Sequence, residues 1–156
     1  MSEADLGGAI LNEALLYYAN LANAQLSYAQ LNLTHLPYAN LTGADLSHCS
    51  LKRSAFVGAT LINAILNASD LSGSIFTDAS LVNADLTAIT ISQETFFWKA
   101  NLKGADLSYS DFSKTKLDKA QLLGAMSLYK TKLPPSVNVL DLKKSYPRLF
   151  EDPYKE

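Results

Sequence analysis

The side chains that could carry out chemistry are few, and they do not form a recognisable catalytic set. The chain has two histidines, His35 and His48, and one cysteine, Cys49. The adjacent His48 and Cys49 would suggest zinc, but a zinc site needs three or four converging ligands. The aspartates are spread along the chain rather than paired, and no serine, histidine and acid form an inferable triad. We therefore expect a protein that is not an enzyme and that has no catalytic residues, no metal site and no cofactor.

A large apolar residue recurs at every fifth position, and this spacing must position everything else. The series runs from Leu6 to Ile91, resumes after one inserted residue at Phe97, and ends at Leu122. Of its 24 members, 19 are leucine. A small residue, most often alanine, stands two positions before almost every member, with Ile89 as the exception, and Cys49 is one of these small residues.

Neither regular secondary structure can bury residues spaced by five. An α-helix would turn about 140° between them, and a flat strand would place them on alternate faces. The pattern works when the chain turns a corner once per repeat, so that the small residue and the leucine both point inward. Ser, Thr, Asn and Gly dominate the two positions after the leucine, as corners require. The recurring glycines, including Gly43 and Gly58, are then corner residues rather than a phosphate-binding loop, and the sequence predicts a solenoid.

The repeated Ala-(Asp/Asn)-Leu-(Ser/Thr)-X pattern resembles that of the pentapeptide repeat proteins over about residues 4–124. The resemblance implies an all-β fold, a right-handed quadrilateral β-helix with four pentapeptides per coil and about six coils. At ~4.8 Å per strand the rod would be roughly 29 Å long. Phe56, Phe76 and Phe97 would stack inside one wall. The resemblance also points to a bacterial, often cyanobacterial, source.

Two irregularities divide the chain. The inserted residue predicts a bulge within 92–95, which turns Thr95 and Phe97 inward and keeps Glu94 out of the core; it is either a site or a tolerated insertion. After Gly124 the pattern stops, so we expect a repeat domain over 1–124 and a cap over 125–156. Ser136 could start a short helix over about 137–145, ended by Pro147.

One wall carries aromatic and apolar residues on its outer face, whereas the other walls are mainly polar. Such a row is typical of a protein contact surface; scattered exposed apolar residues on an unpartnered surface are the alternative. The expected protein-binding residues are Leu15, Tyr17, Tyr18, Tyr38, Val57, Ile75, Phe96 and Trp98. They predict a non-catalytic scaffold that binds another, unidentified protein.

Charge suggests an alternative function. Asp5, Asp45, Asp85 and Asp106 should share one wall, with Asp70 and Asp111 on the next. Some pentapeptide repeat proteins are rods that resemble duplex DNA, bind DNA gyrase and protect it from quinolones. This chain has a net charge of only −2, with −6 in residues 1–98 and +4 in 99–156, which makes it a poor polyanion. The lysines lack an interleaved aromatic platform, so we expect no nucleic-acid partner.

Composition limits the cellular context. Hydrophobic residues make up 48% of the chain, but no apolar run approaches the ~20 residues of a membrane span, so no membrane partner is expected. The N-terminus has no secretory signal pattern and the single cysteine fits a reducing compartment, which together predict a cytoplasmic location. The first coil has no predicted cap, which suggests a homodimer through that coil or through the aromatic wall.

Overall fold

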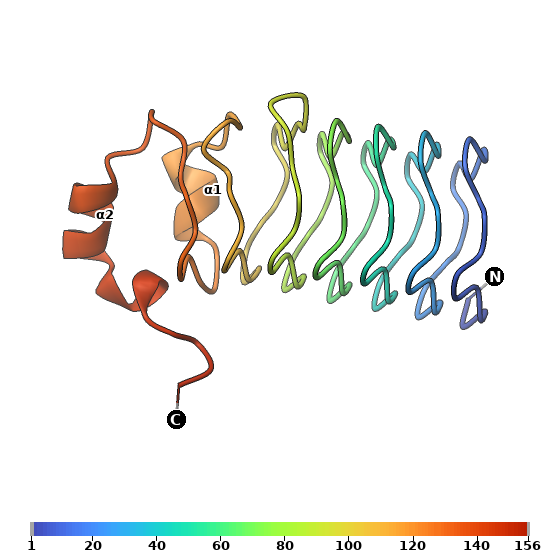
Figure 1. The fold of residues 1–156 in the computed structure, drawn as a ribbon, viewed down its shortest axis with the longest axis horizontal. Helices are drawn as coiled ribbons and strands as arrows, with labels where there is room; N and C mark the ends of the chain where they lie inside the picture. The colour runs from blue at the N-terminus through green and yellow to red at the C-terminus, as the bar shows by residue number, and fades with distance from the viewer. Residues whose placement is uncertain (1, 156) are drawn as a thin grey trace.

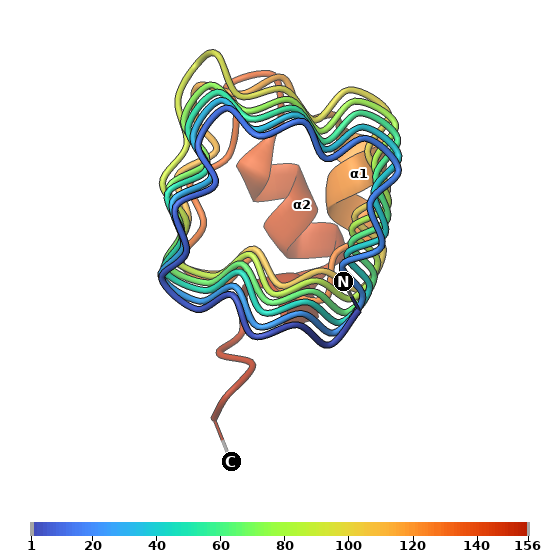
Figure 2. The same ribbon diagram turned by 90° about the vertical axis from the view of Figure 1, so that its right-hand side faces the viewer.

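The five-residue spacing becomes a parallel ladder that closes every 20 residues (Figure 1). This computed structural model describes residues 2–155, and seen along the rod the coils superpose as a square outline (Figure 2). Each strand contributes a single bridge residue, so the walls are defined by columns of bridges. Wall 1 is Asp5, Gln25, Asp45, Ile65, Asp85, Asp106 and Ser127; wall 2 is Ile10, Gln30, Ser50, Asp70 and Thr90; wall 3 is Leu15, His35, Ala55, Ile75 and Phe96; wall 4 is Asn20, Asn40, Thr60, Ser80 and Asn101.

The residues on either side of each bridge residue fill the interior, as predicted. Ala24 and Leu26 are fully buried, whereas Gln25 between them is exposed. The predicted aromatic column is confirmed: Phe56 and Phe76 stack with ring centroids 4.7 Å apart, and Phe76 and Phe97 with centroids 5.2 Å apart. The apolar centres thus form one continuous core along the rod, which is where most of its stability originates.

Most polar residues in the small inward positions donate to backbone carbonyls of the preceding coil, whereas Ser74 and Thr115 donate to a carbonyl three residues before them. The Ser69 hydroxyl donates to the Leu46 carbonyl oxygen at 2.6 Å, and the Thr34 hydroxyl donates to that of Leu11 at 2.9 Å. In residues 2–155, no buried side-chain nitrogen or oxygen lacks a hydrogen-bond partner. A serine or threonine can therefore replace alanine without an unpaired buried polar group.

Cys49 occupies one of these positions, and its thiol donates to the Leu26 carbonyl oxygen at 2.9 Å. Burial raises the pKa of the thiol from 9.0 to about 11. Only the thiolate reacts with iodoacetamide. We expect alkylation of the folded protein at pH 8 to be at least ~100-fold slower than in urea, because the two-unit shift alone lowers the thiolate fraction about that much. Labelling followed by mass spectrometry checks this, and equal rates with and without urea would contradict the inward position of Cys49.

The corners are two residues long, and the second residue has a left-handed backbone. Tyr18 and Tyr38 have φ of 56° and 57°, and Gly58 on the same corner has φ of 63°. Non-glycine residues accept this conformation at a cost, and here the ladder holds it. The Tyr18 N–H donates to the Pro37 carbonyl at 3.0 Å, and the Tyr38 N–H donates to that of Val57 at 2.9 Å. Corner side chains of successive coils therefore lie above one another.

The register changes where the sequence predicted. The corner after Ile91 is one residue longer than the others, so its turn falls on Gln93 and Glu94 and Ile75 pairs with Phe96 at a spacing of 21 residues. Thr95 and Phe97 are buried and Glu94 is exposed. The Thr95 hydroxyl accepts the Ser92 N–H at 3.1 Å and donates to the Leu71 carbonyl at 3.0 Å. The insertion is thus absorbed at one corner, and the core continues past it.

The C-terminal part differs from the prediction in an additional helix, in the extent of the ladder and in the bounds and cap of the last α-helix. The short helix α1, Lys119–Leu123, occupies a segment expected to be a repeat, although Leu122 is still buried. The Asp118 carboxylate caps it by accepting the Gln121 N–H, and the Gln121 side-chain oxygen accepts the Asp118 N–H in return. This capping box favours helix over a corner. The ladder also continues beyond Gly124, because Asp106 pairs with Ser127 and Asp111 pairs with Lys132.

The expected C-terminal helix is shorter than predicted. Helix α2 is Val139–Ser145, and Asn138 rather than Ser136 caps it by accepting the Asp141 N–H. A 3-10 helix, η1, Pro147–Phe150, follows. Helix α2 lies across the end of the rod, where Leu142 is buried (Figure 1, Figure 2). None of the helices in the described part of the chain has the length or apolar run needed to cross a membrane.

Candidate protein-binding surface

The structure brings all eight predicted contact residues to wall 3 and to the corner between walls 3 and 4. Leu15, Ile75 and Phe96 are bridge residues of wall 3, and their side chains point outward. Tyr17, Val57 and Trp98 take the first corner position in their coils, and Tyr18 and Tyr38 take the second. Tyr18 is 73% exposed and Trp98 is 63% exposed. Five-residue counting alone therefore places the set on one side of the rod.

Near the N-terminal end, the rings are held by stacking. The Tyr18 and Tyr38 rings have centroids 5.3 Å apart and planes within 11° of parallel. The Tyr38 ring then lies over Gly58, where an added Cβ would come within 2.5 Å of the ring. The Tyr17 ring stacks on the His35 imidazole at 6.0 Å. Rings fixed in this way lose little further freedom when they bind.

The surface is interrupted in the middle, which counting by apolar residues did not predict. The coil that lies between those of Val57 and Trp98 carries Thr77 and Asp78 at this corner. Phe96 and Trp98 form a second group beyond this break, where the Lys99 ammonium lies 4.3 Å from the centre of the Trp98 ring. The predicted wall is thus two aromatic groups joined by Val57 and Ile75.

Aromatic stacking also occurs on the corner after wall 1, where the sequence analysis predicted no contact residue. Tyr28 and His48 stack with centroids 4.8 Å apart and planes 3° from parallel. Their 20-residue separation was the available signal. His48 therefore faces outward over Tyr28, whereas the thiol of Cys49 faces inward, and the two do not converge on a metal. Within residues 2–155, no three His, Cys, Asp or Glu side chains could hold a metal ion together.

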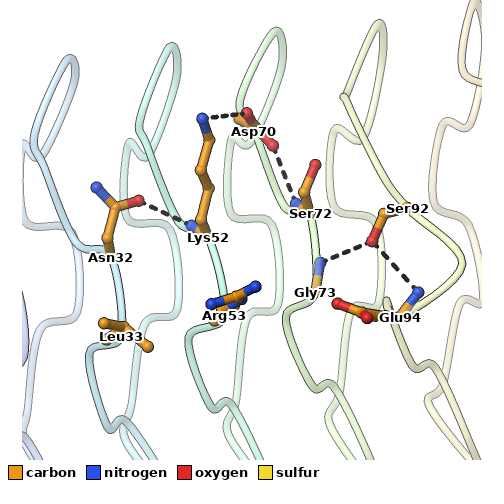
Figure 3. Close-up of a pocket in the computed structure, with 9 residues that line it drawn as sticks. All are labelled: Asn32, Leu33, Lys52, Arg53, Asp70, Ser72, Gly73, Ser92 and Glu94. Carbon is orange, nitrogen blue, oxygen red and sulfur yellow. Dashed lines mark hydrogen bonds and ion pairs between the residues drawn. The ribbon is translucent and has the colours of Figure 1, made fainter.

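A polar groove lies on the corner between walls 2 and 3, next to the bulge (Figure 3). The Lys52 ammonium and the Asp70 carboxylate form an ion pair at 3.2 Å across two coils. Burial raises the pKa of Asp70, but hydrogen bonds from Ser72 and Lys52 outweigh it, so the pKa lies below its usual value. The Ser92 hydroxyl oxygen accepts the N–H groups of Gly73 and Glu94 at 3.1 and 3.2 Å. The ion pair and the bond from Gly73 to Ser92 hold neighbouring coils together.

The carboxylates of walls 1 and 2 are partly engaged. Asp45, Asp85 and Asp106 share wall 1 as predicted, and the first two accept corner N–H groups at 2.9 Å. Asp106 is buried beneath the C-terminal tail, where the Tyr154 hydroxyl donates to it at 2.6 Å. Lys132 pairs with Asp111 at 2.9 Å. Hydrogen bonds to the Asp111 carboxylate, first from Ser113 and then from Lys132, lower its pKa to about 2.

Comparison with solved structures shows related rods. HetL, a pentapeptide repeat protein involved in heterocyst differentiation regulation in the cyanobacterium Nostoc sp. strain PCC 7120, is 33% identical, with a TM-score of 0.58; the match covers 86% of this chain and 57% of HetL. The chain thus spans a little over half the length of HetL. A pentapeptide repeat protein from the Arabidopsis thaliana thylakoid lumen is 27% identical, with a TM-score of 0.47 and coverage of 78% and 74%.

A more distant match is trypsin-treated QnrB1, a plasmid-mediated fluoroquinolone resistance protein, at 16% identity and a TM-score of 0.43, covering 86% of this chain and 81% of QnrB1. No curated protein sequence matches the chain. The family model of pentapeptide repeats matches residues 1–36, 14–53, 54–93 and 93–122, which together cover most of the chain. Together with the square coils, the stacked inward leucines and the likeness to HetL, this match places the chain in the pentapeptide repeat family.

Proposed function

We propose that this chain is a non-catalytic scaffold that binds another protein through wall 3 and its following corner. The observation that carries the proposal is a pair of exposed ring stacks, Tyr18 on Tyr38 and Tyr17 on His35. Rigid aromatic groups on a polar surface are the residues that dominate binding energy at protein interfaces. The coil-to-coil hydrogen bonds hold the corner backbone in place, so little ordering would be required on association.

The alternative of a DNA-mimicking gyrase protector has less support. Such a rod needs a continuous negative face, and three of its six predicted carboxylates are engaged by other groups of this chain. Asp70 is paired with Lys52, Asp111 is paired with Lys132, and Asp106 is covered by Tyr154. A gyrase supercoiling assay with added quinolone separates the two functions, because a scaffold for a different protein should leave the enzyme's inhibition unchanged. The cytoplasmic location stays a prediction.

The test is a capture experiment with matched surface variants. We expect the wild type to retain a partner from extract of the source cells and Tyr38→Ser/Trp98→Ser to lose it, since each truncated anchor costs ~2 kcal/mol or more. The control is Tyr28→Ser/Tyr109→Ser, which removes two exposed rings from the corner after wall 1. Circular dichroism shows whether all three proteins are folded.

The outcomes separate the candidate surfaces. Retention lost only in the Tyr38→Ser/Trp98→Ser variant supports the proposal. Equal retention by all three proteins places binding elsewhere and contradicts it. Light scattering on the same samples detects self-association: a dimer that dissociates only in the Tyr38→Ser/Trp98→Ser variant would make the partner a second copy of this chain.

A further inference from the structure

The ladder of wall 3 is open between the coil of Phe96 and the next coil. In the regular part, the Phe76 N–H donates to the Phe96 carbonyl at 2.7 Å, and the Phe96 N–H donates to the Ser74 carbonyl at 3.0 Å. The same pattern would join Phe97 and Thr95 to Lys116. Within the described residues, no backbone hydrogen bond links 95–99 to 115–118.

Helix α1 contributes to the opening, which already begins on wall 2, where Thr90 and Asp111 form no bridge. The helix begins directly after 116–118 and takes the place of wall 4 in this coil. A helix rises about 1.5 Å per residue and a strand about 3.3 Å, so the segment before the helix cannot stay in register with the coil below. The Gln121 side-chain amide instead donates to the carbonyls of Phe97 and Ala100 at 2.8 and 3.0 Å. The core stays closed on the inside, while the Phe97 N–H and the Thr95 carbonyl of wall 3 form no backbone hydrogen bond to 115–118.

A pocket of about 270 Å³ lies at this opening, lined by Thr95, Phe96, Phe97, Trp98 and Lys116. Phe96 is 43% exposed, and Trp98 more so, while Thr95 and Phe97 are buried. Sites for small molecules usually measure about 300–1,000 Å³. A smaller pocket with two aromatic sides suits one large apolar side chain of a peptide.

The charges at the pocket are positive and have no carboxylate partner. Lys116 lines the pocket and Lys99 lies over the Trp98 ring, and neither forms an ion pair within residues 2–155. The acid nearest to Lys116 along the chain is Asp118, and its carboxylate accepts the Gln121 N–H at 2.8 Å and caps α1. Asp78, one coil before on the same corner, is bonded to neither lysine. A ligand with carboxylates would complement this edge.

We infer that this pocket receives an extended acidic segment of the partner protein. One large apolar side chain of the segment enters between Phe96 and Trp98, and flanking carboxylates meet Lys99 and Lys116. This inference rests on the proposed scaffold function and adds the chemistry of the partner and the place of its anchor.

Trp98 is the only tryptophan of the chain, so its fluorescence reports on this pocket directly. The probe is the peptide acetyl-Asp-Glu-Phe-Glu-Asp-amide, which has no fluorescence at tryptophan wavelengths. We expect a saturable change in Trp98 emission. Affinity should be about 10-fold weaker when the peptide's Phe is replaced by Ala, and no saturation is expected with a peptide that carries lysines in place of the acids. Added salt should weaken binding, since the charged groups are exposed.

Variants that keep Trp98 identify the contact. Lys116→Gln should weaken binding of the acidic peptide about 5-fold or more, whereas Lys103→Gln, an exposed lysine outside the pocket, should not change it. Phe96→Ser should weaken it as well. No saturable change with the acidic peptide, or equal affinity for the acidic and basic peptides, or an unchanged affinity in Lys116→Gln, would overturn the inference.

The two proposals can fail separately. If the peptide does not bind but Tyr38→Ser alone loses the cellular partner, the scaffold function stands and the pocket assignment falls. If the peptide binds but neither Tyr38→Ser nor Trp98→Ser affects capture, the pocket is an acidic-peptide site independent of the proposed wall 3 scaffold.

Discussion

Leu66→Asp is expected to abolish the cooperative unfolding transition of the rod. Leu66 is fully buried in the middle of the core, with apolar centres in the coils before and after it. An unpaired carboxylate there loses its hydration and finds no donor, and the leucine contacts are lost as well. The cost should exceed about 4 kcal/mol, a large part of the ~5–15 kcal/mol that stabilises a typical domain.

The neighbouring residue provides the control. Ile65 lies on the outer face of wall 1 and is 41% exposed. Ile65→Lys introduces a charge one position away, between Asp45 and Asp85 of the neighbouring coils, and should leave the thermal unfolding curve nearly unchanged, as exposed substitutions usually do. Thermal melts followed by circular dichroism compare the two variants. A folded, soluble Leu66→Asp protein with the wild-type melting temperature would contradict the inward position of this residue.

The coils were predictable because a five-residue repeat leaves few physical alternatives. Every coil repeats the same arrangement, with small residues and leucines inward and polar residues such as Asp or Asn between them. An atypical residue at one position therefore does not change the prediction for the coil. The bulge was predictable for a related reason. Keeping the register would have buried Glu94, and the alternative placed Thr95 and Phe97 in the core, where the structure has them.

Helix α1 was not predicted because its sequence satisfies two patterns at once. Leu117 and Leu122 are five apart and both are buried, as in a repeat. The same segment carries Asp118 and Gln121 at the spacing of a capping box, and this local signal favours the helix. Repeat counting also could not show that the ladder opens beside α1, because the apolar centres on both sides of the opening keep their spacing. The pocket at Trp98 therefore needed the three-dimensional structure, although Trp98 itself did not.

The position of the aromatic residues could be predicted from the sequence, but the orientation of their rings could not. Counting in steps of 20 placed Tyr18, Tyr38 and Trp98 on one corner, because the ladder keeps equivalent positions together. Ring orientation could not be read from the sequence. The stacking of Tyr18 on Tyr38 depends on the left-handed corner backbone and on the space that Gly58 leaves for the ring.

Phe76→Ala is the second substitution with a large expected effect. Phe76 is fully buried and lies between the rings of Phe56 and Phe97, at centroid distances of 4.7 and 5.2 Å. Alanine leaves a cavity and removes both stacking contacts, which together should cost about 3–5 kcal/mol. For a chain of this size we expect the melting temperature to fall by roughly 10 °C.

Two companion variants separate ring stacking from simple volume. Ile75→Ala changes the adjacent, outward-facing residue and should shift the melting temperature by much less. Phe76→Leu should recover most of the loss, because leucine fills the equivalent position, fully buried, in many other repeats. If Phe76→Leu is as unstable as Phe76→Ala, the rings contribute through their stacking, and the wall with phenylalanine inside is specialised for it. If Phe76→Leu is close to wild type, the rod needs a large apolar residue at each centre, and the phenylalanine column adds little to that requirement.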